Sequence, residues 1–228
     1  MIKKSIIFFV IISVSFLIYQ KKFKNSNLEI WDLVPAKSVM IIEINDPLNK
    51  WNKFSSSVNE NQFRDFRKLI DKNISVLNSF LNNKLNVLVD NNNLIVSVSK
   101  TSKEGFDFLF TSNSKNLDFQ YVLKKAKDSL SFDITTRDFN DEKIYDFSDG
   151  TNFFSVVVLN NFISLSKNTL LIEDVIRSSQ NKNLSFKNIN QDLFNQVMVQ
   201  NDFGNIFLNF TELSNSFENH KYLSLIHI

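Results

Sequence analysis

The region from 132 to 165 alternates short apolar stretches with turn-forming residues, and this pattern restricts the fold more than any other feature. It predicts four strands: Phe132–Phe139, Lys143–Phe147, Phe153–Leu159 and Phe162–Leu165. The connections contain Asn, Asp and Gly, which tolerate the positive φ of tight turns. Two-residue turns are expected at Asp149-Gly150 and Asn160-Asn161. Consecutive strands joined in this way form an antiparallel meander.

The stretch Leu33–Pro47 marks the start of the folded module. Pro35 disfavours helical geometry in the residue before it, and the β-branched run that follows predicts a strand over Ser38–Ile44. Asp46 and Pro47 predict a helix start, because the carboxylate accepts free backbone N–H groups and proline has none to lose. Two amphipathic helices are expected after it, one carrying Leu48, Trp51, Phe54 and Val58 and one over Glu60–Leu81.

The remaining elements continue this mixture of strands and helices. Further strands are predicted over Leu85–Val89 and Leu94–Val98, joined as a hairpin by Asp90–Asn93, and over Phe106–Thr111 and Asn205–Phe210. Further helices are predicted from Asp118, from a cap at Asn168 or Thr169, over Asn190–Val199 and from about Glu212. The predicted fold class is therefore α+β, with antiparallel sheets of hairpins and a meander covered by amphipathic helices. We expect one buried cluster made of Phe106, Phe108, Phe110, Phe153, Val157 and Ile172.

An apolar segment near the start predicts a membrane location. Residues 5–19 are apolar apart from three serines and are flanked by lysines on both sides. As a helix this segment spans about 22 Å, against a hydrocarbon core of about 30 Å. Small residues typical of a signal-peptide cleavage site do not follow it, which favours an uncleaved anchor over a cleaved signal peptide. The predicted organisation is an anchor or signal segment over 1–22, a tether over 23–32 and an extracytoplasmic or periplasmic α+β module over 33–222, held at the inner membrane.

The composition excludes several classes of function. The 26 basic and 24 acidic residues are mixed along the 228-residue chain and give a net charge of +2, so no nucleic-acid partner is expected. The chain has no cysteine, which excludes disulfides and Cys-based zinc sites. The 24 phenylalanines and the many Asn, Lys and Ile residues are typical of A/T-rich codon usage, and we do not interpret this excess as functional.

No catalytic, cofactor-binding or metal-binding residue is predicted, and no cofactor is expected. The sequence contains no phosphate-binding glycine loop, nucleophile elbow or zinc-helix motif, and His220 and His227 have no partners at ligand spacing. Glu173 and Asp174 are interpreted as complementing a helix dipole. Other polar candidates are interpreted as exposed turn charges or as chance matches to the glycosylation sequon: Arg137, Asp138, Asp141 and Glu142, and Asn73, Asn183 and Asn209.

A family resemblance rests on three stretches: Leu33–Ala36 with the strand and Trp-bearing helix after it, Lys143–Phe147, and Phe162–Lys167 with the helix Leu170–Arg177. Together they resemble a domain-of-unknown-function family of membrane-anchored envelope proteins from Bacteroidetes-type bacteria. The resemblance covers roughly 33–217. It implies an N-terminal anchor and an extracytoplasmic α+β module, and it supplies no catalytic residue.

The last six residues, Leu223–Ile228, resemble the translation of a sequencing adapter, CTGTCTCTTATACACATC. We therefore expect 223–228 to be an adapter artefact and the module to be cut short near Tyr222. The expected structural consequence is a weakly packed tail together with an exposed sheet edge or apolar patch.

Three functional hypotheses remain open from the sequence. The first is a non-enzymatic module that is bound to the membrane by its N-terminal helix and that either binds another envelope component, such as an envelope protein, or scaffolds a downstream domain. The second is a hydrolase of envelope polymers that uses paired carboxylates, with candidates Asp138, Asp141, Glu142 and Asp146. The third is a lipid- or ligand-binding module, which would need an apolar cavity among the phenylalanines.

Overall fold

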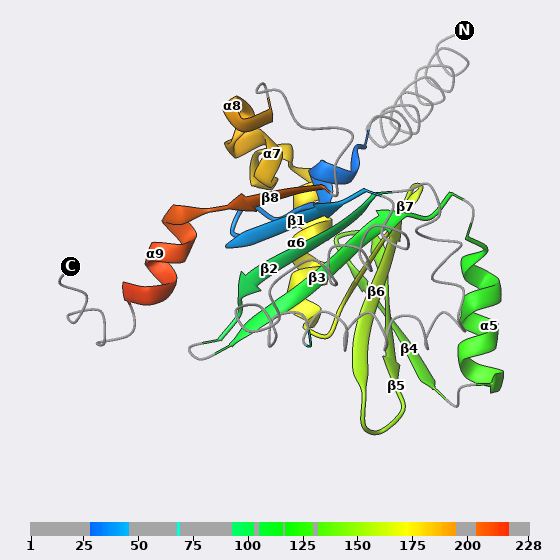
Figure 1. Ribbon diagram of the computed structural model, residues 1–228. Coiled ribbons are helices and arrows are strands. Elements are labelled where there is room, and N and C mark those ends of the chain that lie inside the picture. Colours follow the sequence, from blue (N-terminus) through cyan, green and yellow to red (C-terminus); the bar gives the residue numbers. More distant parts are fainter. Residues whose placement is uncertain are drawn as a thin grey trace, which may run out of the picture.

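An eight-stranded antiparallel sheet forms the centre of the computed structural model, which describes residues 28–45, 68, 93–102, 105–115, 117–129, 132–194 and 204–218 (Figure 1). The strand order across the sheet is β4-β5-β6-β7-β3-β2-β1-β8. Its strands are β1 (Met40–Ile44), β2 (Leu94–Lys100), β3 (Phe106–Asn113), β4 (Asp133–Phe139), β5 (Glu142–Ser148), β6 (Phe153–Leu159), β7 (Phe162–Ser166) and β8 (Gly204–Leu208).

Two meanders lie side by side in this sheet. Strands β1, β2 and β3 form the first, and β4 to β7 form the second, which the turn chemistry predicts. They meet where β3 pairs with β7, with Phe110 opposite Leu165. Strand β8 is the last strand at this side of the sheet, and it pairs with β1 so that Ile206 lies opposite Ile42. The predicted α+β class is confirmed, as one continuous sheet.

One face of the sheet carries an aromatic and aliphatic core. Strand residues facing this side alternate with those facing the other, and the buried set includes Ile42, Val96, Phe110, Phe147, Phe154 and Leu165. Helix α5 (Phe119–Ser129) contributes the buried Val122 and Ala126 to the same core. It begins at the predicted position, and the Asp118 carboxylate accepts the Tyr121 N–H at 3.1 Å.

The other face is covered by α6 (Thr169–Gln180), the 3-10 turn η1 (Ile30–Leu33) and the short helix α7 (Phe186–Ile189) (Figure 1). Asn168 caps α6 as predicted, accepting the Leu170 N–H at 3.0 Å. Helix α6 buries its apolar residues against Ile144 and Val157 of the sheet. A second 3-10 turn, η2 (Lys182–Leu184), and the helices α8 (Gln191–Phe194) and α9 (Phe210–Glu218) complete the described elements.

Trp31, in the segment predicted as a tether, packs against the sheet. It belongs to a third buried cluster with Ile41 and Ile95, and its ring meets those of Phe194 and Phe207 edge-on at 4.8 and 5.3 Å. The last residues of the segment predicted as a tether, 28–32, therefore pack against the module. A capping box between Glu29 and Asp32 fixes the turn that places Trp31 there.

The predicted single core is wrong in two ways. Phe106 and Phe153 are 44% exposed, because they stand at strand ends beyond the covering elements. Phe108 and Phe110 lie on one face, whereas Val157 and Ile172 lie on the other. The sheet separates them, so residues that look equivalent in the sequence belong to different cores.

Several connections and element ends also differ from prediction. The tight two-residue turn after β4 is Asn140-Asp141, both at positive φ, whereas 149–152 forms a four-residue connection. There the Asp149 carboxylate accepts the backbone N–H groups of Thr151 and Asn152 at 2.9 and 2.6 Å. Hydrogen bonds from the Asn152 side chain and backbone, and then from Thr151, hold the pKa of Asp149 well below its usual range.

The predicted hairpin between 85–89 and 94–98 is not formed by β2. Both sides of β2 are occupied, by β1 with Ile42 opposite Val96 and by β3 with Val96 opposite Phe110. An apolar strand buried on both faces, with residues such as Leu94, Ile95 and Val96, needs a neighbour on each side. Strand β8 ends at Leu208, earlier than predicted, because Phe210 begins α9.

Other predictions lie outside the described residues: the membrane segment, the helix after Pro47, nearly all of Glu60–Leu81, the sequon at Asn73, His220, His227 and the tail 223–228. Lys68 is the described residue of Glu60–Leu81, and it is helical and exposed, as expected for the polar face of that helix. In the described parts, no helix has the length and apolarity needed to cross a bilayer.

Candidate functional site

Arg137 of β4 is the centre of the most extensive polar cluster in the described structure. Its Nε donates to Asp146 Oδ2 at 3.1 Å, one terminal nitrogen donates to Glu173 Oε1 at 2.9 Å, and the other donates to the Thr169 hydroxyl. Asp146 also accepts the Ser155 hydroxyl at 2.5 Å. Arg137 thus joins strands β4, β5 and β6 to helix α6 on one side of the sheet.

Glu173 is shared between two arginines. Its second oxygen accepts Arg177 at 3.2 Å, and Arg177 also pairs with Asp174 at 2.6 Å. The Arg177 guanidinium lies 4.9 Å from the centre of the Phe139 ring. Glu173 lies beyond the first turn of α6, and that turn carries no acidic residue, so the dipole interpretation is wrong. Its carboxylate instead attaches α6 to the sheet through Arg137.

The four acidic candidates for hydrolysis do not come together. Asp138 and Asp141 are exposed and Glu142 is half-buried, at the end of the β4–β5 hairpin. Asp146 points to the α6 side, where the carboxylate that joins it is Glu173, and Arg137 binds both. Arg137 uses each of its three nitrogens to hold this cluster in place. The cluster therefore acts as a structural clamp in the described residues.

We expect Arg137→Ala to lower the free energy of unfolding by about 1–2 kcal/mol, because Asp146 and Glu173 lose charge-assisted hydrogen bonds. Arg177→Ala is the matched control: its ion pairs lie within one helix and at the surface, and it touches the sheet through the Phe139 ring and not through an ion pair. It should cost less than about 1 kcal/mol. Urea unfolding of both variants checks this, and equal losses would show that Arg137 does not clamp α6.

The phenylalanines on the first face pack against one another. Phe147 and Phe154 stack with ring centres 5.3 Å apart, and Phe132 meets them edge-on at 6.4 and 5.4 Å. Phe147 and Phe154 are fully buried. In this part of the described core the rings therefore contact one another directly.

Metal ligands and sequons add no site within the described residues. There, no group of three or more His, Asp or Glu side chains is placed to hold a metal ion. Asn183 is exposed. Asn209 is occupied by the fold, since its side chain donates to Ala36 O at 3.3 Å and accepts the Glu212 N–H at 3.2 Å. It therefore works as a cap for α9.

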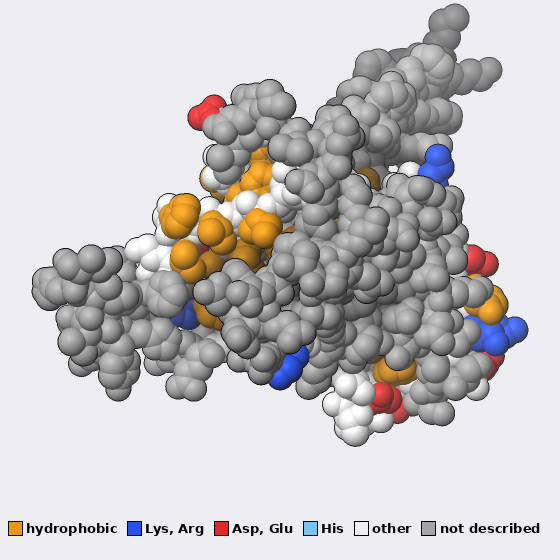
Figure 2. All heavy atoms as spheres, in the orientation of Figure 1, with side chains coloured by type: hydrophobic (Ala, Val, Ile, Leu, Met, Phe, Trp, Pro, Cys, Tyr) orange, Lys and Arg blue, Asp and Glu red, His pale blue; other side chains and the backbone are white. Residues whose placement is uncertain are grey.

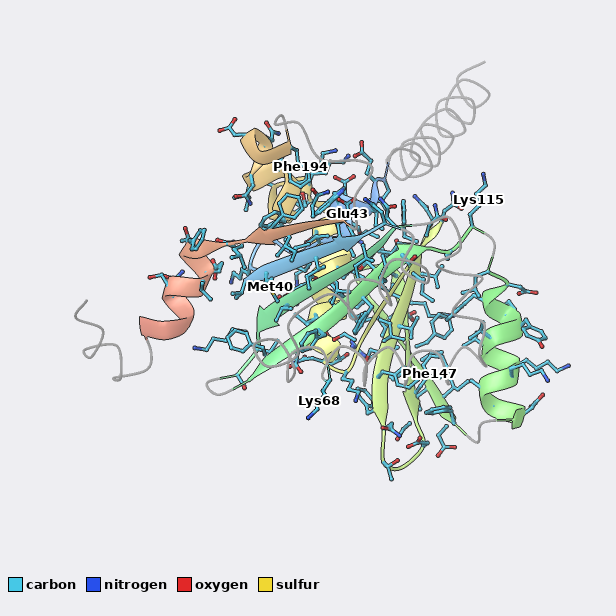
Figure 3. All side chains as sticks on the ribbon, in the orientation of Figure 1. Met40, Glu43, Lys68, Lys115, Phe147 and Phe194 are labelled. Carbon is cyan, nitrogen blue, oxygen red and sulfur yellow. The ribbon has the colours of Figure 1, made fainter. Side chains whose placement is uncertain are left out.

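Glu43 is a buried carboxylate that connects three strands. It lies on β1, and its two oxygens accept Asn93 Nδ2 at 3.1 Å and Asn205 Nδ2 at 2.8 Å. Asn93 precedes β2, and Asn205 belongs to β8. Glu43 therefore fixes β8 against β1 through a side-chain contact in addition to the backbone ladder. Figure 3 labels Glu43 on this part of the sheet.

Strand β8 forms one edge of the sheet and exposes apolar side chains. Ile206 is 56% and Leu208 is 46% exposed, and Phe210, which begins α9, is 71% exposed. Figure 2 shows hydrophobic side chains gathered over the part of the sheet where Figure 1 places β8 and β1. In the described residues, an exposed edge with an apolar patch therefore lies at β8.

The two edges of the sheet differ in charge. Edge strand β4 carries Asp133, Arg137 and Asp138, and charged side chains on an edge oppose pairing with other chains. Strand β8 reads Gly-Asn-Ile-Phe-Leu and has no charge, proline or bulge. Of the two edges, β8 is therefore the one that can accept another strand.

The ladder between β1 and β8 determines which backbone groups of β8 face outward. The Asn209 N–H donates to Val39 O at 2.8 Å, in the same register as the β1–β8 pairing. Because bonding alternates along an antiparallel ladder, the N–H and C=O groups of Gly204, Ile206 and Leu208 point away from β1. Among the described residues, no strand pairs with these groups.

The sequence predicts this strand but does not identify it as a binding surface. The available indication is that 204–208 contains no charged residue, a property that it shares with other short stretches such as 195–200. Neither family models, curated proteins nor solved structures give a significant match to this chain. The geometry of the site is therefore the basis for its interpretation.

Proposed function

We propose that this chain is a membrane-anchored, extracytoplasmic binding module of the cell envelope, which binds protein through the open edge of β8. The apolar segment at 5–19 supports the membrane location, and the mixed surface charge with a net value of +2 supports a protein partner over nucleic acid. One observation carries the proposal: β8 combines outward backbone groups with the exposed side chains of Ile206 and Leu208.

An added strand satisfies both features of this edge. Its backbone pairs with the outward N–H and C=O groups of Gly204, Ile206 and Leu208, and its alternate side chains cover the apolar row. Glu43 and the β1 ladder hold β8 in place, so the acceptor strand is already ordered before a partner arrives. The paired Arg137 cluster offers no comparable surface, because its hydrogen-bonding groups are directed at one another.

Photo-cross-linking of the full chain in the cells that encode it tests this proposal. A photoreactive residue at Leu208 should give a defined protein adduct, and the same residue at Phe153 is the control, since Phe153 is 44% exposed on another part of the sheet. A second change, Ile206→Pro, removes one outward N–H without touching the β1 ladder and should abolish the adduct. Equal adducts at Leu208 and Phe153, or an adduct that Ile206→Pro leaves intact, would contradict the proposal, as would recovery of the chain in the soluble fraction.

A further inference from the structure

We propose that the strand which occupies the β8 edge is β8 of a second copy of this chain, paired antiparallel across a two-fold axis. This inference rests on the proposed function and names its partner. Any occupant of this edge must supply outward N–H and C=O groups on alternate residues and apolar side chains on one face. Strand β8 supplies both, so it is complementary to itself.

The backbone fits in a register centred on Ile206. This register places Ile206 opposite Ile206 of the second copy, and Gly204 opposite Leu208 of the second copy. All of these residues have N–H and C=O groups directed outward, as derived from the β1–β8 ladder. Each outward donor therefore meets an outward acceptor, and no hydrogen-bonding group at the junction is left unpaired.

The side chains fit in the same register. On the exposed face, the two Ile206 side chains lie side by side, and they extend the row in which Ile206 neighbours Ile42. Leu208 of one copy lies over Gly204 of the other, where the absence of a side chain leaves room. On the opposite face, Asn205 of one copy lies beside Phe207 of the other. No charged residue occurs in either strand, so no like charges meet at this junction.

The contrast between the two sheet edges favours β8-to-β8 pairing over other pairings between copies. Pairing of β4 with β4, or of β4 with β8, would place Asp133, Arg137 or Asp138 at the junction. Only a pairing of like edges closes after two copies, because it is isologous, whereas β4 with β8 would continue into an open fibre. Charges on β4 therefore limit the assembly to a dimer.

Single-cysteine cross-linking of the full chain tests the register directly, because the natural sequence contains no cysteine. In the Ile206-centred register, Ile206→Cys places two Cα atoms about 5.5 Å apart, within the range of a disulfide. Leu208→Cys is the matched control on the same face of the same strand. In the same register, the cysteines introduced at position 208 of the two copies lie four residues apart along the strand, at a separation of roughly 14 Å.

Mild oxidation of membranes that contain each variant should convert most of the Ile206→Cys protein to a disulfide-linked dimer and leave Leu208→Cys monomeric. The single substitution Ile206→Lys should abolish the dimer that sedimentation in detergent detects for the natural chain. Equal cross-linking of both cysteine variants, or of neither, would overturn this inference. A photo-adduct from Leu208 to a different protein, without the cysteine dimer, would leave the proposed function standing and reject the second copy as partner.

Discussion

Replacing Phe154 with alanine should lower the free energy of unfolding by about 3–5 kcal/mol. Phe154 is 1% exposed and stacks on Phe147 with ring centres 5.3 Å apart. Val156, two residues further along β6, is also fully buried on this face. Removing the ring leaves a cavity between β5, β6 and the edge-on ring of Phe132, and these strands cannot close it without breaking their ladder. Urea or thermal unfolding of the full chain measures the loss.

The adjacent residue provides the matched control for this prediction. Phe153 lies on the same strand and has the same side chain, but it is 44% exposed on the opposite face of the sheet. Phe153→Ala should cost less than about 1 kcal/mol, since little apolar surface returns to water. Similar losses for the two variants would mean that the first-face core does not depend on Phe154, and the assignment of the two faces would then be wrong.

Gly204→Ala should separate the start of β8 from β1 and cost about 3 kcal/mol, the upper end for overpacking. A Cβ at this position would lie 1.8 Å from the Glu43 backbone oxygen and 3.2 Å from the Ile44 Cα. Both atoms belong to β1 and cannot move aside without breaking the ladder to β2. The strain therefore falls on β8, which lies at the edge of the sheet.

Trp31 fluorescence reports this separation. Its ring contacts Phe207 of β8, so displacement of β8 should expose Trp31 and shift its emission to longer wavelength. A Trp51→Phe background leaves Trp31 as the single reporter, because the chain has two tryptophans. Gly105→Ala is the control, since its added Cβ meets only the flexible Ser102 hydroxyl at 2.8 Å. An unshifted emission and unchanged stability in Gly204→Ala would contradict the close approach of β8 to β1.

Local patterns predicted the local part of this fold. The meander β4 to β7 follows from alternating residues and turn chemistry, as at Asn160-Asn161, and the start of α6 follows from Asn168 as a cap. These features depend on residues a few positions apart. The sequence therefore contains the information for them without reference to the rest of the chain.

Long-range pairing could not be predicted in this way. The sequence pattern predicts that β2 pairs with 85–89, whereas its neighbours are β1, more than 40 residues earlier, and β3. Likewise, local sequence suggests only a dipole-complementing role for Glu173, because its partner Arg137 lies 36 positions away on β4. Which face a strand residue occupies depends on that pairing, and for this reason the predicted single cluster, which joins Val157 to Phe108 and Phe110, is wrong.

Part of the β8 site was predictable. The strand itself and an exposed edge were expected, but its neighbour β1 and the exposure of Ile206 and Leu208 follow from pairing across 162 positions, between Glu43 and Asn205. The absence of charge in 204–208 becomes meaningful only once this strand is known to form an edge. In a central strand, the absence of charged residues would follow from burial alone.

Hydrogen exchange at the outward amides of β8 tests the central claim most directly. In purified full-length protein, the Ile206 and Leu208 amides should become protected as protein concentration rises, while the Phe207 amide, which faces β1, stays protected throughout. Val96 of β2, paired on both sides, is the internal reference for a concentration-independent amide. We expect the protection of the Ile206 and Leu208 amides to rise with protein concentration and to be lost in Ile206→Lys. Rapid exchange of both amides at every concentration would contradict pairing at this edge.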